Sequence, residues 1–421
     1  FSGDKVPGAF NPDPAAYRPE TVPTAGTVIP STISVISENF KMPQTWKSSL
    51  AVDVQLPFGI VGSLEGIYNK DLNTAIFRNA NLVDPQALNV SGYADNRLIY
   101  PSANQDKFIN PLLNGQAVPN GTAKAGAFNA IVLDNASKGY YWSVTAKLDK
   151  QFNNGLMASL AYARSESKNQ FDGGGDQPLS AFQSTATVNG SNFPTLGYAG
   201  FVVPSRVIAS LSYRKEYFNH LGTTVSLFYE GSSQGRFSYT YSRDFNRDGA
   251  NADLIYIPRN ASEITFVDQT VGSGESAKVY TAQEQSDMFF AYVAQDDYLS
   301  KHMGEYAERN AVKMPWRNQF DFKFTQDLFT DIGGKRNTLQ FSWDVFNIGN
   351  LINSDWGVYK SVNASSILVP TNETKLTAGG TTVPTFRLAL DRGDLVKSTF
   401  RDDVSINSTY YMQFGLRYIF N

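Results

Sequence analysis

Apolar and polar residues alternate with a period of two along much of this 421-residue chain. In a β-strand, this alternation places one set of side chains on each face. Within 339–345, for example, Leu339, Phe341 and Trp343 are separated by polar residues. The pattern is strong at 45–56, 139–150, 316–328, 339–345 and 410–420, and weaker at 60–71, 156–165, 204–217 and 222–242. The sequence therefore predicts an all-β fold of about nine strands.

The connections between these segments alternate in length. Tight turns are expected at 57–59, 153–155, 219–222 and 331–335, and long connections at about 72–138, 166–203, 243–315 and 349–408. An outer-membrane barrel has short periplasmic turns and long extracellular loops. Strands that cross a membrane need about 9–11 residues, whereas soluble strands usually have about 5–6. The alternating segments of this chain have the length of membrane-crossing strands, so a transmembrane antiparallel β-barrel is favoured over a soluble β-sandwich.

Composition narrows the alternatives further. The chain has no Cys, which excludes disulfides, thiolate metal sites and cysteine nucleophiles. A net charge of -3 gives no sign of nucleic-acid binding. Aromatic residues make up 13% of the chain, and barrels use such residues as belts at the two membrane interfaces. The residues expected in these belts are Tyr140, Trp142, Trp316, Trp343 and Tyr418.

An odd number of strands raises a problem of closure. Single-chain bacterial barrels have an even number of strands, and an open sheet leaves backbone groups unsatisfied in lipid. We therefore expect 45–421 to be the C-terminal part of a barrel, with its first strands and an N-terminal plug preceding Phe1. The segment 1–44 is rich in Pro and Thr, and it is predicted to be an extracellular loop.

Short stretches spread in order over the chain carry a family likeness. They are 39–47 (NFKMPQTWK), 56–59, 64–70, 238–241, 244–249, 253–258, 304–310, 314–318, 344–350 (DVFNIGN) and 415–421 (GLRYIFN). In combination they resemble the C-terminal barrel half of Oar-like TonB-dependent receptors, which are outer-membrane proteins of the Bacteroidota type.

The resemblance implies a plugged barrel of about 22 strands, of which this chain supplies about the last nine. It also implies a bacterial outer-membrane location and uptake of a ligand, captured by the outer loops, with energy passed on by TonB. The implied partners are the plug and remaining strands of the same receptor, the TonB–ExbB–ExbD complex, outer-membrane lipids and surface lipoproteins, and no nucleic acid. Tyr418 and Phe420 resemble the aromatic C-terminal assembly signal, although the trailing Asn421 departs from a terminal Phe.

One local motif has the spacing of a calcium loop. Oxygen ligands at every second position with Gly at the sixth suit Ca²⁺. The ligand set would be Asp244, Asn246, Asp248, the Ala250 carbonyl and Asp253. Ile255 stands where a bidentate Glu is expected. The alternative is a turn rich in Asp and Asn that needs no metal, and no other cofactor is indicated.

Several aromatic residues lie in the predicted loops and could stack on a ligand, or could pack the loops against one another. The candidates for ligand binding are Tyr239, Tyr241, Tyr280, Phe289 and Tyr292. The only histidines, His220 and His302, belong to no recognisable nucleophile motif, so no enzymatic activity is expected.

Two other functions stay open beside TonB-dependent transport. A passive porin-like channel would differ from a receptor only in the N-terminal part. An outer-membrane structural or secretion-associated barrel would act as a binding platform. The sequence leaves the ligand undetermined among peptides, glycans, siderophores and cobalamin.

Overall fold

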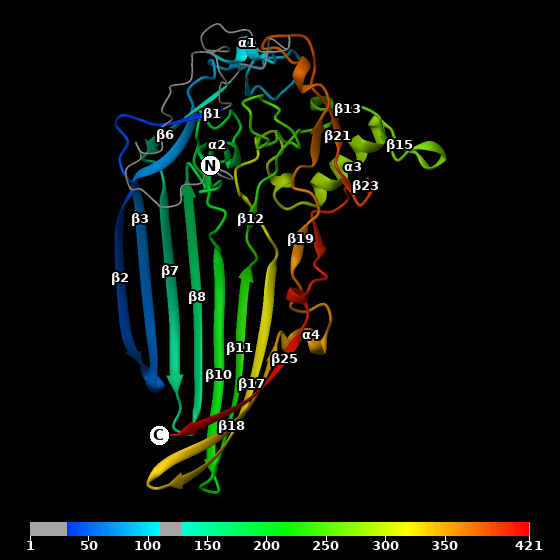
Figure 1. Ribbon diagram of the computed structural model, residues 1–421. Coiled ribbons are helices and arrows are strands. Elements are labelled where there is room, and N and C mark those ends of the chain that lie inside the picture. Colours follow the sequence, from blue (N-terminus) through cyan, green and yellow to red (C-terminus); the bar gives the residue numbers. More distant parts are fainter. Residues whose placement is uncertain (1–31, 110–127, 421) are drawn as a thin grey trace, which may run out of the picture.

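The computed structural model describes residues 32–109 and 128–420. In them the strong and weak alternating segments all form strands of one antiparallel meander, which confirms the predicted all-β fold. Each strand pairs with the next along the chain (Figure 1). These nine strands are β2 (Gln44–Leu56), β3 (Ile60–Asn79), β7 (Tyr140–Gln151), β8 (Leu156–Asn169), β10 (Ser205–Tyr217), β11 (Leu221–Ser233), β17 (Trp316–Ile332), β18 (Lys335–Phe346) and β25 (Tyr411–Phe420).

The cross-strand register gathers the apolar side chains on one face of the sheet. Leu211 lies opposite Leu227, and Leu227 lies opposite Phe322 on its other side. Many large apolar side chains on this face are exposed, and Leu50 and Leu416 are 75% and 73% exposed. In water such a surface is unfavourable, whereas on the outside of a barrel it contacts hydrocarbon.

Tight turns close the hairpins at one end of the meander. Between β17 and β18 the turn is formed by Gly333 and Gly334, whose φ angles are 64° and 78°. Two-residue hairpin turns of this kind need positive φ at both central positions, which glycine adopts without strain.

Some strand limits differ from the alternation pattern. β3 continues to Asn79, well past the expected end at residue 71, because its upper part pairs with β6 (Asn129–Ala136). In the weakly alternating segment 222–242, the long strand β11 ends at Ser233, before the expected end of the segment. Most of the segment 1–44 lies outside the described residues, and its described part contains β1 (Thr32–Ile36), which pairs in parallel with β6. With β1, β6 and β9 (Gly197–Tyr198), the main sheet has 12 strands.

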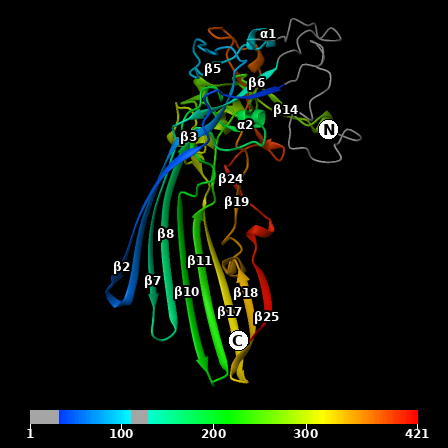
Figure 2. The ribbon, with the colours of Figure 1, turned by 60° about the vertical axis from the view of Figure 1, so that its left-hand side comes forward.

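The long connections fold into a cap above the other end of the sheet (Figures 1 and 2). Its helices are α1 (Asn104–Lys107), α2 (Pro178–Ser184) and α3 (Ala282–Gln295), while α4 (Ile348–Ile352) lies lower, beside β17. Its short strands are β4 (Gln86–Ala87), β5 (Leu98–Ile99), β12 (Arg236–Phe237), β13 (Thr265–Phe266), β14 (Gln269–Val271), β15 (Lys278–Tyr280), β16 (Val312–Lys313), β19 (Lys360–Val362), β20 (Leu368–Pro370), β21 (Thr385–Leu388), β22 (Leu390–Asp391), β23 (Asp394–Leu395) and β24 (Phe400–Asp402). No helix within 32–109 or 128–420 has the length and apolar character needed to cross a membrane.

The main hydrophobic core of the described residues lies in this cap, not in the sheet. It brings together Leu88, Phe289 and Leu388, which come from three different connections and are fully buried. Val188, from a fourth connection, packs against it. A shared core of this kind makes the connections one folded body, because none of them buries enough apolar surface alone.

Candidate functional site

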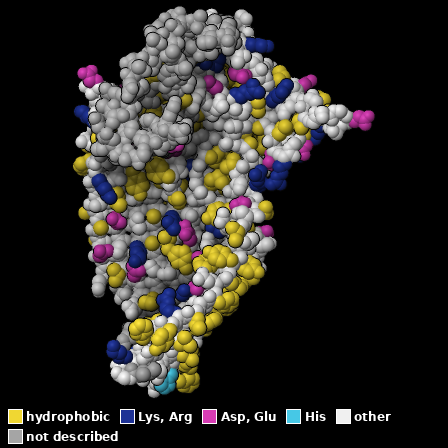
Figure 3. All heavy atoms as spheres, in the orientation of Figure 1, with side chains coloured by type: hydrophobic (Ala, Val, Ile, Leu, Met, Phe, Trp, Pro, Cys, Tyr) yellow, Lys and Arg dark blue, Asp and Glu magenta, His cyan; other side chains and the backbone are white. Residues whose placement is uncertain are grey.

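The concave face of the sheet carries Lys, Arg, Asp and Glu side chains (Figure 3). Several of them form ion pairs across and along the strands. Ion pairs on this face include Lys147–Asp149 at 2.8 Å, Arg206–Glu230 at 2.9 Å, Arg214–Asp327 at 3.0 Å and Lys323–Asp344 at 2.7 Å. Such charges would be costly against lipid. The face therefore suits a water-filled or plugged interior, as the alternation predicts.

A buried cation ties two connections of the cap together. Arg97 pairs with Asp95 at 2.9 Å, and both side chains are fully buried. The guanidinium also donates a hydrogen bond to the carbonyl of Leu254 at 2.7 Å and lies 4.8 Å from the centre of the Tyr241 ring. Because a buried charge is costly without such partners, this arrangement fixes the relative position of the two connections.

The carboxylates of the predicted calcium motif accept hydrogen bonds from nearby backbone N–H groups. Asp253 accepts from Phe245 at 2.7 Å, and Asp248 accepts from Ala250 at 2.8 Å. A further N–H, from Ser191 in a different connection, donates to Asp248 at 3.2 Å. These contacts shape the segment as a series of turns, the alternative that the sequence left open.

The same carboxylates repel one another in a buried setting. Burial and the neighbouring charge of Asp244 raise the pKa of Asp248 to about 7. Burial also raises the pKa of Asp244, and burial with the charge of Asp248 raises that of Asp253. A cation would relieve this repulsion, and so would a proton.

Binding of a metal ion also requires several ligand side chains to point to one place. Among the described residues, no group of three or more His, Cys, Asp or Glu side chains is arranged to hold a metal ion. The Asn246 side chain accepts from the Asp248 N–H at 2.8 Å, which is a turn contact as well. Calcium binding therefore stays a prediction from the sequence spacing.

The five loop aromatics proposed to stack on a ligand are buried in the cap. Tyr239, Phe289 and Tyr292 are 0% exposed. Tyr241 stacks on another core ring, and Tyr280 is 8% exposed. Tyr241 and Tyr280 contact another connection, at Phe386 and Asp394, whereas Tyr239 and Tyr292 hydrogen-bond to each other within one connection. In this structure all five belong to the packed interior of the cap and are not accessible to a ligand.

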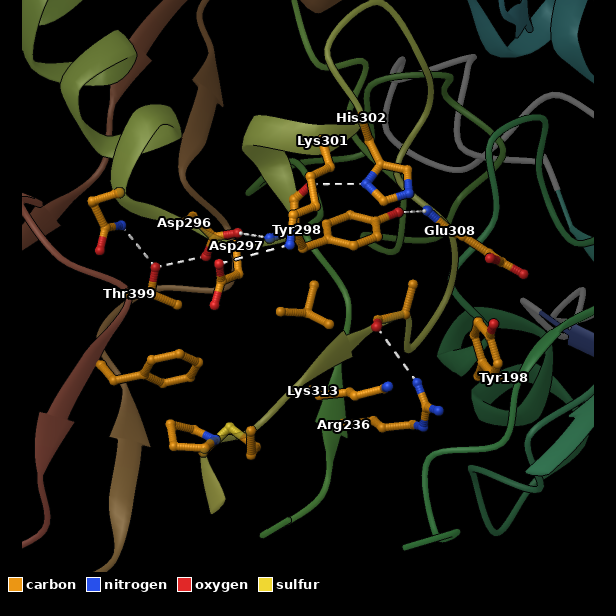
Figure 4. Close-up of a pocket in the computed structure, with 16 residues that line it drawn as sticks. Tyr198, Arg236, Asp296, Asp297, Tyr298, Lys301, His302, Glu308, Lys313 and Thr399 are labelled. Carbon is orange, nitrogen blue, oxygen red and sulfur yellow. Dashed lines mark hydrogen bonds and ion pairs between the residues drawn. The ribbon is translucent and has the colours of Figure 1, made fainter. Parts of the chain in front are cut away.

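A cavity of about 680 Å³ lies where the cap meets the sheet (Figure 4). Arg236 and Lys313 lie together on one side of it, below Tyr298 in this view, and the ring of Tyr198 lies beside Arg236. The Arg236 guanidinium is 4.2 Å from the centre of that ring. Sequence reasoning missed Arg236, Lys313 and Tyr198, because only the pairing of β12 with β16 and of β8 with β9 brings them together.

Both histidines make local contacts with the backbone. His302 lies in the cavity wall, where its ring stacks on Tyr298 at 4.2 Å and its Nδ1 is 2.8 Å from the Tyr298 carbonyl. His220 Nδ1 is 3.2 Å from the Phe329 carbonyl. The absence of enzymatic activity stays a prediction.

The two residues of the predicted assembly signal lie on the apolar face of the last strand. Tyr418 and Phe420 are 60% and 75% exposed, and the Tyr418 hydroxyl donates to the Asn337 side chain at 2.6 Å. Their position fits contact with lipid. Recognition by an assembly machinery stays a prediction.

Comparison with known families gives one match over most of the chain. Residues 3–367 match a family described as "Outer membrane beta barrel domain". This range includes the strands from β2 to β18 and most of the cap. No curated protein matches the chain.

Proposed function

The chain belongs to the outer membrane beta barrel domain family, and on that basis we propose that it acts as a TonB-dependent receptor. Its location is the bacterial outer membrane. In this proposal the outer loops capture a ligand, and the ligand enters through a plugged barrel. The finer resemblance to Oar-like receptors supports the same role.

The observation that carries the proposal is the folded cap. Its connections share one core, and the buried Arg97 bonds to the carbonyl of Leu254, 157 positions along the chain. Loops ordered before binding lose less conformational entropy when they take hold of a ligand. A passive channel needs no such ordered surface at its mouth, so the cap favours a receptor.

The edges of the meander support a larger wall. In the described ranges, β2 and β25 each pair on one side only, with β3 and β18 respectively. In lipid, the other side of each edge needs a backbone partner. We propose that further strands of the same receptor supply these partners and that a plug covers the ion pairs of the concave face. The TonB–ExbB–ExbD complex would then act on the plug.

Two measurements on the intact receptor test this function. Purified receptor is assayed for binding to the periplasmic domain of TonB, and receptor in liposomes is assayed for swelling in solutions of neutral sugars. We expect TonB binding and no swelling, since a plug would block the interior. Swelling without TonB binding would establish the porin-like channel instead.

A third arm addresses the binding platform. Small molecules that co-purify with the receptor are identified by mass spectrometry, and their uptake is compared in strains with and without the receptor. Loss of uptake in the deletion strain is expected. Stable surface partners together with undiminished uptake would favour a platform.

A further inference from the structure

The cavity at the base of the cap opens on the lipid side of the sheet. Its Tyr198 lies opposite Lys168 in the pairing of β9 with β8. Lys168 projects from β8 on the same face as Tyr162 and Leu160, since these positions differ by even numbers. Leu160 and Tyr162 are large, exposed side chains of the apolar face. Arg164 and Glu166 lie between Tyr162 and Lys168 on this face. The cavity therefore lies beyond the polar border of the apolar band, in the region where lipid headgroups meet an outer-membrane barrel.

Two cations of this cavity have no carboxylate partner. Arg236 and Lys313 lie directly opposite each other in the β12–β16 pair, an arrangement of like charges that is destabilising by itself. Among the described residues, the guanidinium of Arg236 donates to the backbone carbonyls of Asn310 at 3.1 Å and Ala311 at 3.4 Å, and it stacks on the ring of Tyr198. Neither cation forms a salt bridge with any residue that the structure describes.

The pKa shifts of Arg236 and Lys313 also indicate that a bound anion would stabilise the pair. Burial lowers the pKa of Arg236, and burial together with the charge of Arg236 lowers the pKa of Lys313. An anion placed between them would offset both effects. Glu166 and Glu308 act in the opposite direction on Arg236, and Glu166 does so on Lys313. Their charges do not offset burial, because both pKa values stay lowered and neither carboxylate forms a salt bridge with these cations within the described residues.

The carboxylates in the cavity wall are already committed elsewhere. Glu308 pairs with Lys168 at 2.5 Å. Asp296 is buried and accepts a hydrogen bond from Thr399 at 2.6 Å. Asp297 is fully exposed to solvent. Within the described residues, none of the three forms a salt bridge with Arg236 or Lys313, so both cations have room for a direct contact with an external anion.

Part of the cavity wall is apolar and adjoins the lipid-facing surface along the chain. Met314, Pro315 and Phe400 line it there. The next residue along the chain is Trp316, which is 43% exposed at the top of β17 on the apolar face. A molecule with an anionic head and apolar tails can contact both the two cations and the apolar surface beside them. A free inorganic anion would contact only the cations.

We propose that this cavity binds the phosphate of an outer-leaflet lipid, with Arg236 and Lys313 on the phosphate and the acyl chains over Trp316. Lipid binding of this kind lies outside the barrel and is independent of the transported ligand. It would hold the cap at a fixed height above the membrane.

The test compares lipid binding by the intact receptor and by charge variants. The probes are dioleoyl phosphatidic acid and, as the neutral comparison, dioleoyl phosphatidylcholine, titrated in detergent and counted by native mass spectrometry. The test variant is the double substitution Arg236→Gln with Lys313→Gln. The matched control is Lys47→Gln with Arg417→Gln. It also removes one Lys and one Arg charge, but from the concave face of β2 and β25. Heat-modifiable migration on gels verifies that each variant is folded.

We expect wild type and control to bind phosphatidic acid more tightly than phosphatidylcholine. The test variant should bind phosphatidic acid at least about tenfold more weakly, since each charge-assisted contact is individually strong. Equal affinity for the two lipids in wild type, or an unchanged affinity in the test variant, would overturn the proposal. Displacement of the lipid by inorganic phosphate, but not by sodium chloride of equal ionic strength, would assign the cavity to a free anion and overturn it as well.

Discussion

The side chains of Arg97 and Asp95 form a salt bridge of 2.9 Å while both are fully excluded from solvent. The Arg97 guanidinium lies over the rings of Tyr241 and Phe245, at 4.8 and 5.0 Å from their centres, so it connects parts of the cap that are far apart in the sequence. Because neither charge can reach water, each depends on the other.

Replacing Arg97 by Ala should therefore destabilise the cap strongly. Removing one partner of a buried pair costs about 3–5 kcal/mol, since the remaining carboxylate is left uncompensated. Limited proteolysis of the folded receptor should show faster cleavage in the cap, with the sheet left intact. Arg243→Ala is the control, because Arg243 is largely exposed and its pair with Glu373 is 3.3 Å long. Equal protease resistance of the two variants would contradict the assigned role of Arg97.

The stability of the cap should depend on pH through Asp248. Its folded pKa of about 7 lies above the usual aspartate value of 3.8, and burial is the main cause. A raised pKa means that the folded state holds the proton more tightly. The resulting stability is complete below about pH 4 and is lost as the pH rises through about 7. We expect the melting temperature of the cap to fall between pH 5 and pH 8.

The Asp248→Asn variant should make that profile shallower, since it carries no titrating group at this position, while Asp244 and Asp253 still titrate with raised pKa values. The difference between wild type and variant should be a few kcal/mol at most between the two pH values. Asp297→Asn serves as the control, because this carboxylate is fully exposed. Parallel profiles for wild type and Asp248→Asn would show that other groups govern the pH dependence.

If this segment is a series of turns that needs no metal, calcium should have little effect on it at neutral pH. The oxygens of Asp248 and Asp253 already accept backbone N–H bonds, and a bound cation would compete with those donors. Melting curves with and without Ca²⁺ should coincide for wild type and for Asp248→Ala. A calcium-dependent rise in wild type that disappears in Asp248→Ala would instead establish the ion site predicted from the motif.

The two faces of the sheet should respond differently to a new charge. Leu211 projects from the apolar face of β10, and its neighbour Ser210 projects from the concave face. An Arg on the lipid side costs about 2–4 kcal/mol near the bilayer midplane, whereas interior positions tolerate charge. Leu211→Arg should lower both the folded yield in the membrane and the unfolding midpoint in denaturant, and Ser210→Arg should change neither much. The reverse order would invert the assignment of the faces.

Sequence patterning predicts the sheet well because each wall strand repeats the same local rule. A strand such as β17 separates lipid from interior along its whole length, so its alternation is visible without knowledge of any neighbour. The turn at Gly333 and Gly334 has an equally local signature. These features need only a few consecutive residues to be recognised.

The structure of the cap does not follow from a local pattern of this kind. Tyr239 and Tyr292 resemble exposed loop aromatics in the sequence, and they are buried only because distant connections pack around them. The parallel pairing of β1 with β6 likewise depends on a contact between remote segments. The cations of the cavity, Arg236 and Lys313, are opposite each other for the same reason. Long-range packing of this kind leaves no periodic trace, which explains why the candidate site was found only in three dimensions.

The hairpin of β14 and β15 projects from the side of the cap in Figure 1, and its tip at 272–277 is largely exposed. The other connections cannot change length freely, since each contributes to a common interior. This hairpin tip is therefore a place where substitutions and insertions can be accepted without loss of folding. It is also the natural place to insert an epitope for display on living cells.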